Sequence, residues 1–174
     1  MIKTETQTGS GVQDQFVDNA KLAEFAAVLR KKYSLNNKVL FVQSLQFLFE
    51  SLNIDVIKNR GYYAFPPTGL QYLTRALSGK NLEIRILDLN YQFLRRVIYD
   101  DSFNCHNWLD ILDDCLNEYR PFIVGVTAIT VYTDVFKPSF PLTSILKRLR
   151  DRDDCIVIAG GPTATNETEN YLKG

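Results

Sequence analysis

The feature that most constrains the fold is a short, continuously apolar run, Ile156–Ala159, that leads directly into Gly160, Gly161 and Pro162. Runs of this kind are typical of strands buried on both faces, and parallel sheets are built from such strands. A turn at the carboxyl end of a parallel strand lies where open α/β sheets bind ligands. The segment therefore predicts an α/β fold with a ligand site at the two glycines.

Three more strands are expected upstream, over residues 39–42, 82–88 and 122–127, before a fourth over 155–159. In the second, apolar Ile84 and Ile86 alternate with charged residues, which places this strand at the sheet edge. The long connections imply parallel pairing with right-handed crossovers. We therefore expect a flavodoxin-like or Rossmann-like open parallel sheet, in the order 2-1-3-4, flanked by helices. A fifth strand is expected beyond Gly174.

The expected helices carry apolar residues at helical spacing next to a recognisable start or stop. Leu70, Leu73 and Leu77 should form an inward stripe. The apolar connection over residues 43–66 should pack over the sheet edge or over a bound ligand. The expected helix starts are Asp18, Thr68 and Asn107 as caps, Pro141, and Asn166 with Glu169 as a capping box.

The chain divides into three segments by composition. Residues 1–17 are polar and form a flexible lead-in, residues 18–37 form a helix and a linker, and residues 38–174 form the α/β domain. The start lacks the features of a signal peptide, and no apolar run approaches the roughly 20 residues that span a bilayer. We expect a soluble protein that does not associate with membranes.

Charge and cysteine content exclude several functional classes. Lysine and arginine number 20, as do aspartate and glutamate, so no net field attracts nucleic acid or an anionic membrane. Cys105, Cys115 and Cys155 are irregularly spaced and read as reduced, cytoplasmic thiols. With one histidine, His106, and no C-x-x-C pair, no metal site is expected.

The candidate ligand contacts lie after the expected strands and at one helix start. Glycine allows a ligand to approach the backbone, threonine offers hydroxyls, and a helix start after prolines offers free N–H groups. For Gly160 and Gly161, a tight turn that needs a positive φ explains the glycines equally well. The candidates are Pro67, Gly69, Leu70, Thr127, Ala128, Thr130, Gly160, Gly161, Pro162 and Thr163.

No catalytic residue is assigned. His106 adjoins Cys105 but precedes a helix, far along the chain from the expected crevice, so no nucleophilic triad is built. No G-x-G-x-x-G follows a strand, and no P-loop lysine follows Gly161, so dinucleotide and nucleoside-triphosphate sites are excluded.

Five segments occur in an order that resembles the N-terminal cobalamin-binding domain of B12-dependent radical S-adenosylmethionine enzymes. They are Lys38–Val42, Pro66–Leu73, Leu87–Asp88, Pro121–Thr127 and Ile156–Thr165, and the resemblance covers roughly residues 38–172. It implies loops that embrace the corrin ring and its nucleotide tail, with the tail toward 127–130 and 160–163.

The sequence departs from the pattern of this family in two ways. The D-x-H-x-x-G motif whose histidine ligates cobalt is absent, so bound cobalamin would lack a histidine ligand from the loop after the first strand. The C-x-x-x-C-x-x-C triplet is also absent. S-adenosylmethionine and a 4Fe-4S cluster would then belong to a catalytic domain of the same parent chain, an enzyme that methylates or otherwise modifies a carbon centre. This chain would be its N-terminal, non-catalytic fragment, or else a degenerate stand-alone domain that has kept the shape.

Two other functions stay open. In a structural or interaction domain that docks a catalytic domain and binds no cofactor, Phe47, Phe49 and Tyr63 would fill the crevice. A flavodoxin-type flavin carrier would need phosphate-holding hydroxyls after the first strand, where only Ser44 stands.

Overall fold

The structure is a computed structural model that describes residues 19–33, 36–47, 52–127, 141–161 and 164. The chain divides into two compact units, with the boundary in the sequence between Lys32 and Tyr33. In the first, helix α1 (Asn19–Lys32) confirms the predicted helix, and basic residues in its last turn suit the helix dipole. The expected cap, Asp18, lies outside the described residues.

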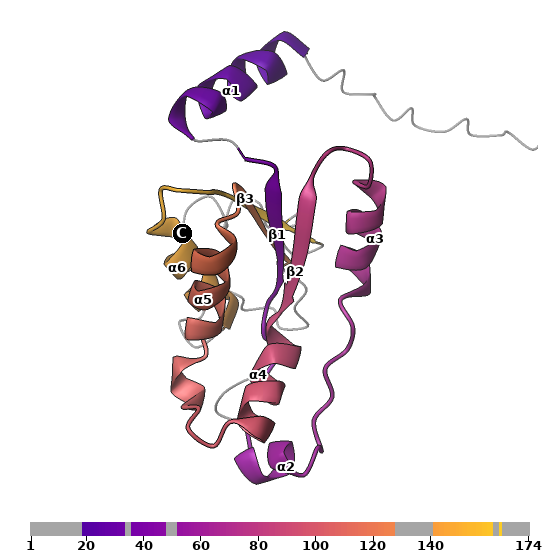
Figure 1. Cartoon of the computed structure of the whole chain (residues 1–174), viewed down its shortest axis with the longest axis vertical. Helices are drawn as coiled ribbons and strands as arrows, with labels where there is room; N and C mark the ends of the chain where they lie inside the picture. The colour runs from indigo at the N-terminus through magenta and orange to yellow at the C-terminus, as the bar shows by residue number, and fades with distance from the viewer. Residues whose placement is uncertain (1–18, 34–35, 48–51, 128–140, 162–163, 165–174) are drawn as a thin grey trace, which may run out of the picture. The chain divides into compact units, whose positions relative to one another are not determined.

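The second unit is built on a four-stranded parallel sheet in the order β2-β1-β3-β4 (Figure 1). This confirms the predicted flavodoxin-like α/β sheet, with the alternating strand at the edge. Each strand begins and ends within one residue of its predicted bounds. The strands are β1 (Lys38–Gln43), β2 (Glu83–Asp88), β3 (Ile123–Thr127) and β4 (Ile156–Gly160).

Two helices were not predicted, α2 (Ile54–Lys58) and α4 (Leu89–Tyr99). The Asp88 carboxylate caps α4 by accepting a hydrogen bond from the Tyr91 backbone N–H at 3.1 Å. The others described in this unit are α3 (Thr68–Ala76), a short 3-10 turn η2 (Cys105–Asn107), α5 (Asp110–Tyr119) and α6 (Pro141–Arg150).

Two of the predicted caps were wrong. Thr68 is the first residue of α3, and no side chain caps that helix. Asn107 belongs to η2, which Asn104 caps by accepting from the His106 backbone N–H at 3.0 Å. The start of α6 at Pro141 is confirmed, whereas Asn166 and Glu169 lie outside the described residues.

The two faces of the sheet are covered very differently. On the covered face, Leu40, Val42, Val124 and Val126 pack with apolar residues of α4, α5 and α6 and are at most 2% exposed. On the opposite face, here called the groove face, the described helix is α3, whose Leu70 packs on Val39 and Phe41. Figure 1 shows α3 and α5 on opposite sides of the sheet.

The connection between β1 and α3 joins the covered-face core. Leu45 is 5% exposed and Ile57 1% exposed, and both belong to the same buried cluster as Leu40. Phe47 packs edge-on against Tyr62, with ring centroids 5.6 Å apart. These three residues therefore pack against the protein's own core and not against a ligand.

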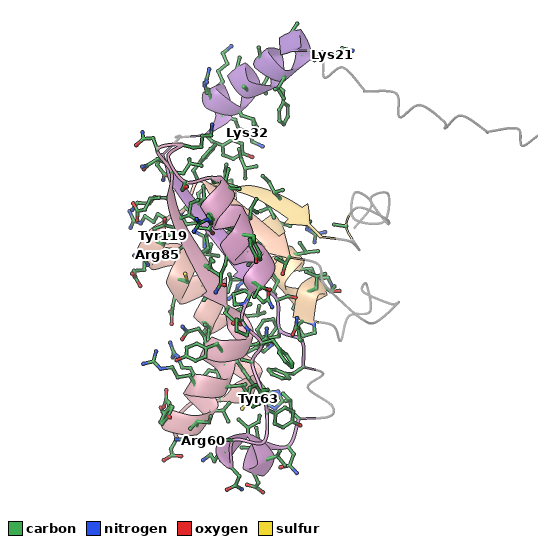
Figure 2. The ribbon with its side chains drawn as sticks, turned by 90° about the vertical axis from the view of Figure 1, so that its right-hand side faces the viewer. Lys21, Lys32, Arg60, Tyr63, Arg85 and Tyr119 are labelled. Atoms are coloured by element: carbon green, nitrogen blue, oxygen red, sulfur yellow. The ribbon has the colours of Figure 1, made fainter. Side chains whose placement is uncertain are left out.

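An aromatic contact ties α5 to the edge strand β2. The Tyr119 hydroxyl donates to the Glu83 carbonyl oxygen at 2.8 Å, and the Arg85 guanidinium lies over the Tyr119 ring at 4.3 Å (Figure 2). Burial, followed by the nearby Glu83 carboxylate, raises the pKa of Tyr119. The charged Arg85 on the covered face of β2 is thus explained by its stacking on the Tyr119 ring.

Candidate functional site

A groove of about 680 Å³ lies along the groove face, between the sheet and the start of α3. Its volume falls within the range of about 300–1,000 Å³ typical of small-molecule sites. None of the described residues that line it is charged, so the groove suits a neutral, largely apolar surface. They are Val39, Phe41, Gln43, Gln46, Phe65, Pro66, Pro67, Thr68, Gly69, Leu70, Leu73, Leu77, Leu82, Ile123, Gly125, Val126, Thr127, Ile158, Gly160 and Gly161.

The strand register explains how the floor of the groove changes from apolar to polar. Partner residues of neighbouring parallel strands face the same side, and every second row faces the groove. The inner row is apolar and consists of Phe41, Gly125 and Ile158. The row at the carboxyl edge carries two polar side chains and a glycine, and consists of Gln43, Thr127 and Gly160.

The glycines of the site serve three different purposes. A Cβ on Gly125 would lie 2.7 Å from Cδ1 of Phe41, so glycine there lets the ring lie on the floor. Gly161 has a φ of 109°, which favours glycine and supports the turn interpretation. A Cβ on Gly160 would meet no atom of the described residues within 4 Å, and its φ is not positive. Neither conformation nor packing therefore requires glycine at position 160, whereas close approach of a ligand would.

The start of α3 forms the wall opposite the sheet. Its N-cap residue, Pro67, supplies no side-chain hydrogen bond, and a Cβ on Gly69 would meet no atom within 4 Å in the part of the chain that the structure describes. Leu70 is buried, but Leu73 is 44% exposed, so the predicted inward stripe is only partly buried. The reason is that Leu73 and Leu77 face the groove instead of a filled core.

The structure brings together every described residue of the predicted site. Pro67, Gly69, Leu70, Thr127, Gly160 and Gly161 come from three segments far apart in the sequence, and all six line the groove. The remaining four, Ala128, Thr130, Pro162 and Thr163, lie outside the described residues.

Sequence reasoning missed the buried polar side chains at the carboxyl end of β1. Gln43 is 6% exposed and lines the groove. Asn90, 1% exposed, holds the segment after Gln43. Its Oδ1 accepts from the Gln46 backbone N–H at 2.7 Å, and its Nδ2 donates to the Ser44 carbonyl at 3.0 Å. Gln43 could have been found as a polar residue two positions after Phe41, on the same strand face.

His106 lines a second hollow of about 450 Å³ beside α2, not the groove. The neighbouring Cys105 thiol has its pKa raised, mainly by burial, so it is not an activated thiolate. Across the described ranges, no three histidine, cysteine or acidic side chains gather as a metal would require. Nor does that part of the chain hold a helix with the length and hydropathy of a bilayer span.

Comparison of the chain with protein-family models, curated proteins and solved structures yields no match, so the geometry of the groove carries the functional argument.

Proposed function

We propose that this chain is the cobalamin-binding module of a radical S-adenosylmethionine enzyme and has no catalytic activity of its own. One observation supports the proposal most strongly. The six described candidate ligand contacts line a single groove, although they come from the start of α3 and the carboxyl ends of β3 and β4. Three of them, Thr127, Gly160 and Gly161, lie in the loops that the family resemblance places beside the nucleotide tail. Residues chosen for a structural role alone would not need to converge on one hollow.

The chemistry of the groove fits part of a cobalamin molecule. The flat, apolar base of the nucleotide tail suits the floor made by Phe41 and Gly125, which bears no charged side chain. The Thr127 hydroxyl and the open backbone at Gly160 would hold polar groups at the mouth. The corrin ring would lie over the carboxyl edge, because the groove has room for only part of so large a ligand.

The groove offers no histidine to cobalt, since the only histidine in the sequence lines the second hollow. When bound, cobalamin supplies methyl or electron transfer at its metal. The residues of this chain would bind it, orient it and exclude water from its tail. S-adenosylmethionine and the 4Fe-4S cluster would be held by a catalytic domain of the parent chain.

Titration with hydroxocobalamin tests the proposal. We expect a change in corrin absorbance and co-elution of colour with the protein on gel filtration. Gly160→Leu fills open space in the groove without a backbone penalty, and should weaken binding at least tenfold. Ala76→Leu, an exposed position of α3 outside the groove, is the matched control. Wild-type protein that neither changes the spectrum nor retains colour would contradict the proposal.

A second candidate is an interaction domain that docks a catalytic domain and binds no cofactor. The observation in its favour is the apolar exposure along the groove, where Ile158 is 51% exposed and Leu73 44% exposed. The aromatic residues that this candidate expects to fill the crevice do not do so in the described part of the chain. Phe47 packs in the covered-face core, Tyr63 is 79% exposed, and neither lines the groove. Phe49 lies outside the described residues.

A further inference from the structure

The described part of the chain contains three polar side chains that are less than one tenth exposed, Gln43, Ser44 and Asn90. Asn90 has both of its amide atoms hydrogen-bonded to backbone, as shown above. Gln43 differs, because its amide finds no hydrogen-bond partner among the described residues. Of the three, only Gln43 lines the groove.

A buried amide without a partner is costly, because it has lost water and gained nothing in return. The strand pleat fixes its direction: Gln43 follows Phe41 by two positions and faces the groove beside Thr127. The amide therefore presents an NH₂ donor group and a carbonyl acceptor to whatever occupies the groove. Its place at the carboxyl end of the central strand is where ligands of open α/β sheets bind.

The surroundings of Gln43 select among possible partners. A carboxylate or phosphate would be buried without a counter-ion, since no charged side chain lines the described groove. Asp88, the register neighbour of Gln43 on β2, is engaged as the cap of α4. A neutral group with a donor and an acceptor on one edge can pair with both polar atoms of the Gln43 amide, and a primary carboxamide is the simplest such group.

We propose that Gln43 recognises a primary carboxamide of the ligand, with Oε1 accepting an N–H and Nε2 donating to the carbonyl oxygen. This inference rests on the proposed function. The corrin ring carries primary carboxamides around its periphery, and Gln43 stands at the edge over which the ring would lie. It adds a specificity-determining residue that neither the sequence motifs nor the family resemblance singled out.

The test compares wild-type protein with Gln43→Met, which keeps the length of the side chain but removes the amide. Gln71→Met is the matched control, because Gln71 is exposed on α3 and does not line the groove. The ligands are hydroxocobalamin and its monocarboxylic acids, in each of which one peripheral amide is hydrolysed. Affinity is measured by absorbance titration, and the Tm of each ligand-free variant is recorded.

We expect Gln43→Met to bind hydroxocobalamin about tenfold more weakly, equivalent to about 1.4 kcal/mol. Its ligand-free Tm should stay level or rise, because a buried unpaired amide has been removed. One monocarboxylic acid should bind the wild type about tenfold more weakly than hydroxocobalamin does, and this discrimination should largely disappear in Gln43→Met. Gln71→Met should behave as the wild type.

Equal binding of hydroxocobalamin by wild type and Gln43→Met would overturn this inference alone. Weaker binding together with a lower ligand-free Tm and unchanged discrimination among the acids would overturn it too, because Gln43 would then act through packing. Failure of the wild type to bind at all would remove the proposed function, and this inference with it.

Discussion

The two faces of the same sheet have opposite roles. Leu40 and Val124 on the covered face are completely buried by α4, α5 and α6. On the groove face, Ile158 is 51% exposed and Leu73, across the groove on α3, is 44% exposed. Because side chains alternate between faces along each strand, neighbouring residues of one strand belong to different environments. The comparison teaches that, among the described residues, most of the buried apolar core lies on one face of the sheet, and the groove lies on the other.

The largest expected difference between the two faces is in the stability lost when a large apolar side chain is replaced by alanine. Leu40→Ala should reduce the free energy of unfolding by about 2–5 kcal/mol, because it removes buried contacts and leaves a cavity. Ile158→Ala should cost about 1 kcal/mol or less, since half of that side chain already contacts solvent. Urea unfolding of both variants measures the difference. Equal losses would mean that the groove face is covered in solution.

A smaller loss of stability is expected from removing Asn90, the α4 side chain that holds the segment after β1. Asn90→Ala leaves the Ser44 carbonyl and the Gln46 N–H without their partner, and should cost about 1–3 kcal/mol. Hydrogen exchange at the Gln46 amide should accelerate. Asn104→Ala, which removes an exposed cap, is the control and should leave that amide unchanged. An unchanged exchange rate in Asn90→Ala would show that Asn90 does not hold this segment.

Substitutions of the adjacent Gly160 and Gly161 should have different effects, because the backbone conformation requires glycine only at Gly161. Gly161→Ala should destabilise the protein by about 1–2 kcal/mol because of its positive φ. Gly160→Ala should change the free energy of unfolding by no more than about 0.5 kcal/mol, yet weaken hydroxocobalamin binding. The same denaturant and absorbance titrations provide both numbers. If Gly160→Ala were as destabilising as Gly161→Ala, the glycine pair would be explained by the turn alone.

The smallest expected effect is a pH dependence on the covered face. The pKa of Tyr119 is raised, mainly by burial, so the folded state favours the protonated phenol. Its contribution to stability is complete below the unfolded pKa of about 10 and is lost as the pH rises above it, through the folded pKa. The difference in unfolding free energy between wild type and Tyr119→Phe should therefore shrink from pH 9 to pH 11. A constant difference would contradict this.

Much of the fold could be predicted from the sequence because parallel strands have a strong local signal. The runs at Val39–Val42 and Ile156–Ala159 are apolar on both sides, and the alternation around Ile84 marks an edge. Helix α4 was missed although its signal was present, since Leu89, Phe93 and Val97 recur four residues apart behind the cap Asp88.

The site was only partly predictable, for a physical reason. Glycines and prolines mark turns in the sequence, which is why Gly69, Gly160 and Gly161 could be identified. Gln43 has no such mark, because its importance depends on which face of β1 borders the groove. That asymmetry results from the crossover connections and is visible only once the strands are assembled.

The most direct test of the account is an amide-resolved NMR titration of ¹⁵N-labelled protein with hydroxocobalamin. We predict shift changes at Phe41, Gly125, Thr127 and Gly160, and little change at covered-face residues such as Leu112 and Ile145, which lie on α5 and α6. A spectrum without changes, or changes confined to the covered face, would contradict the claim that the open side of this sheet is a corrinoid site.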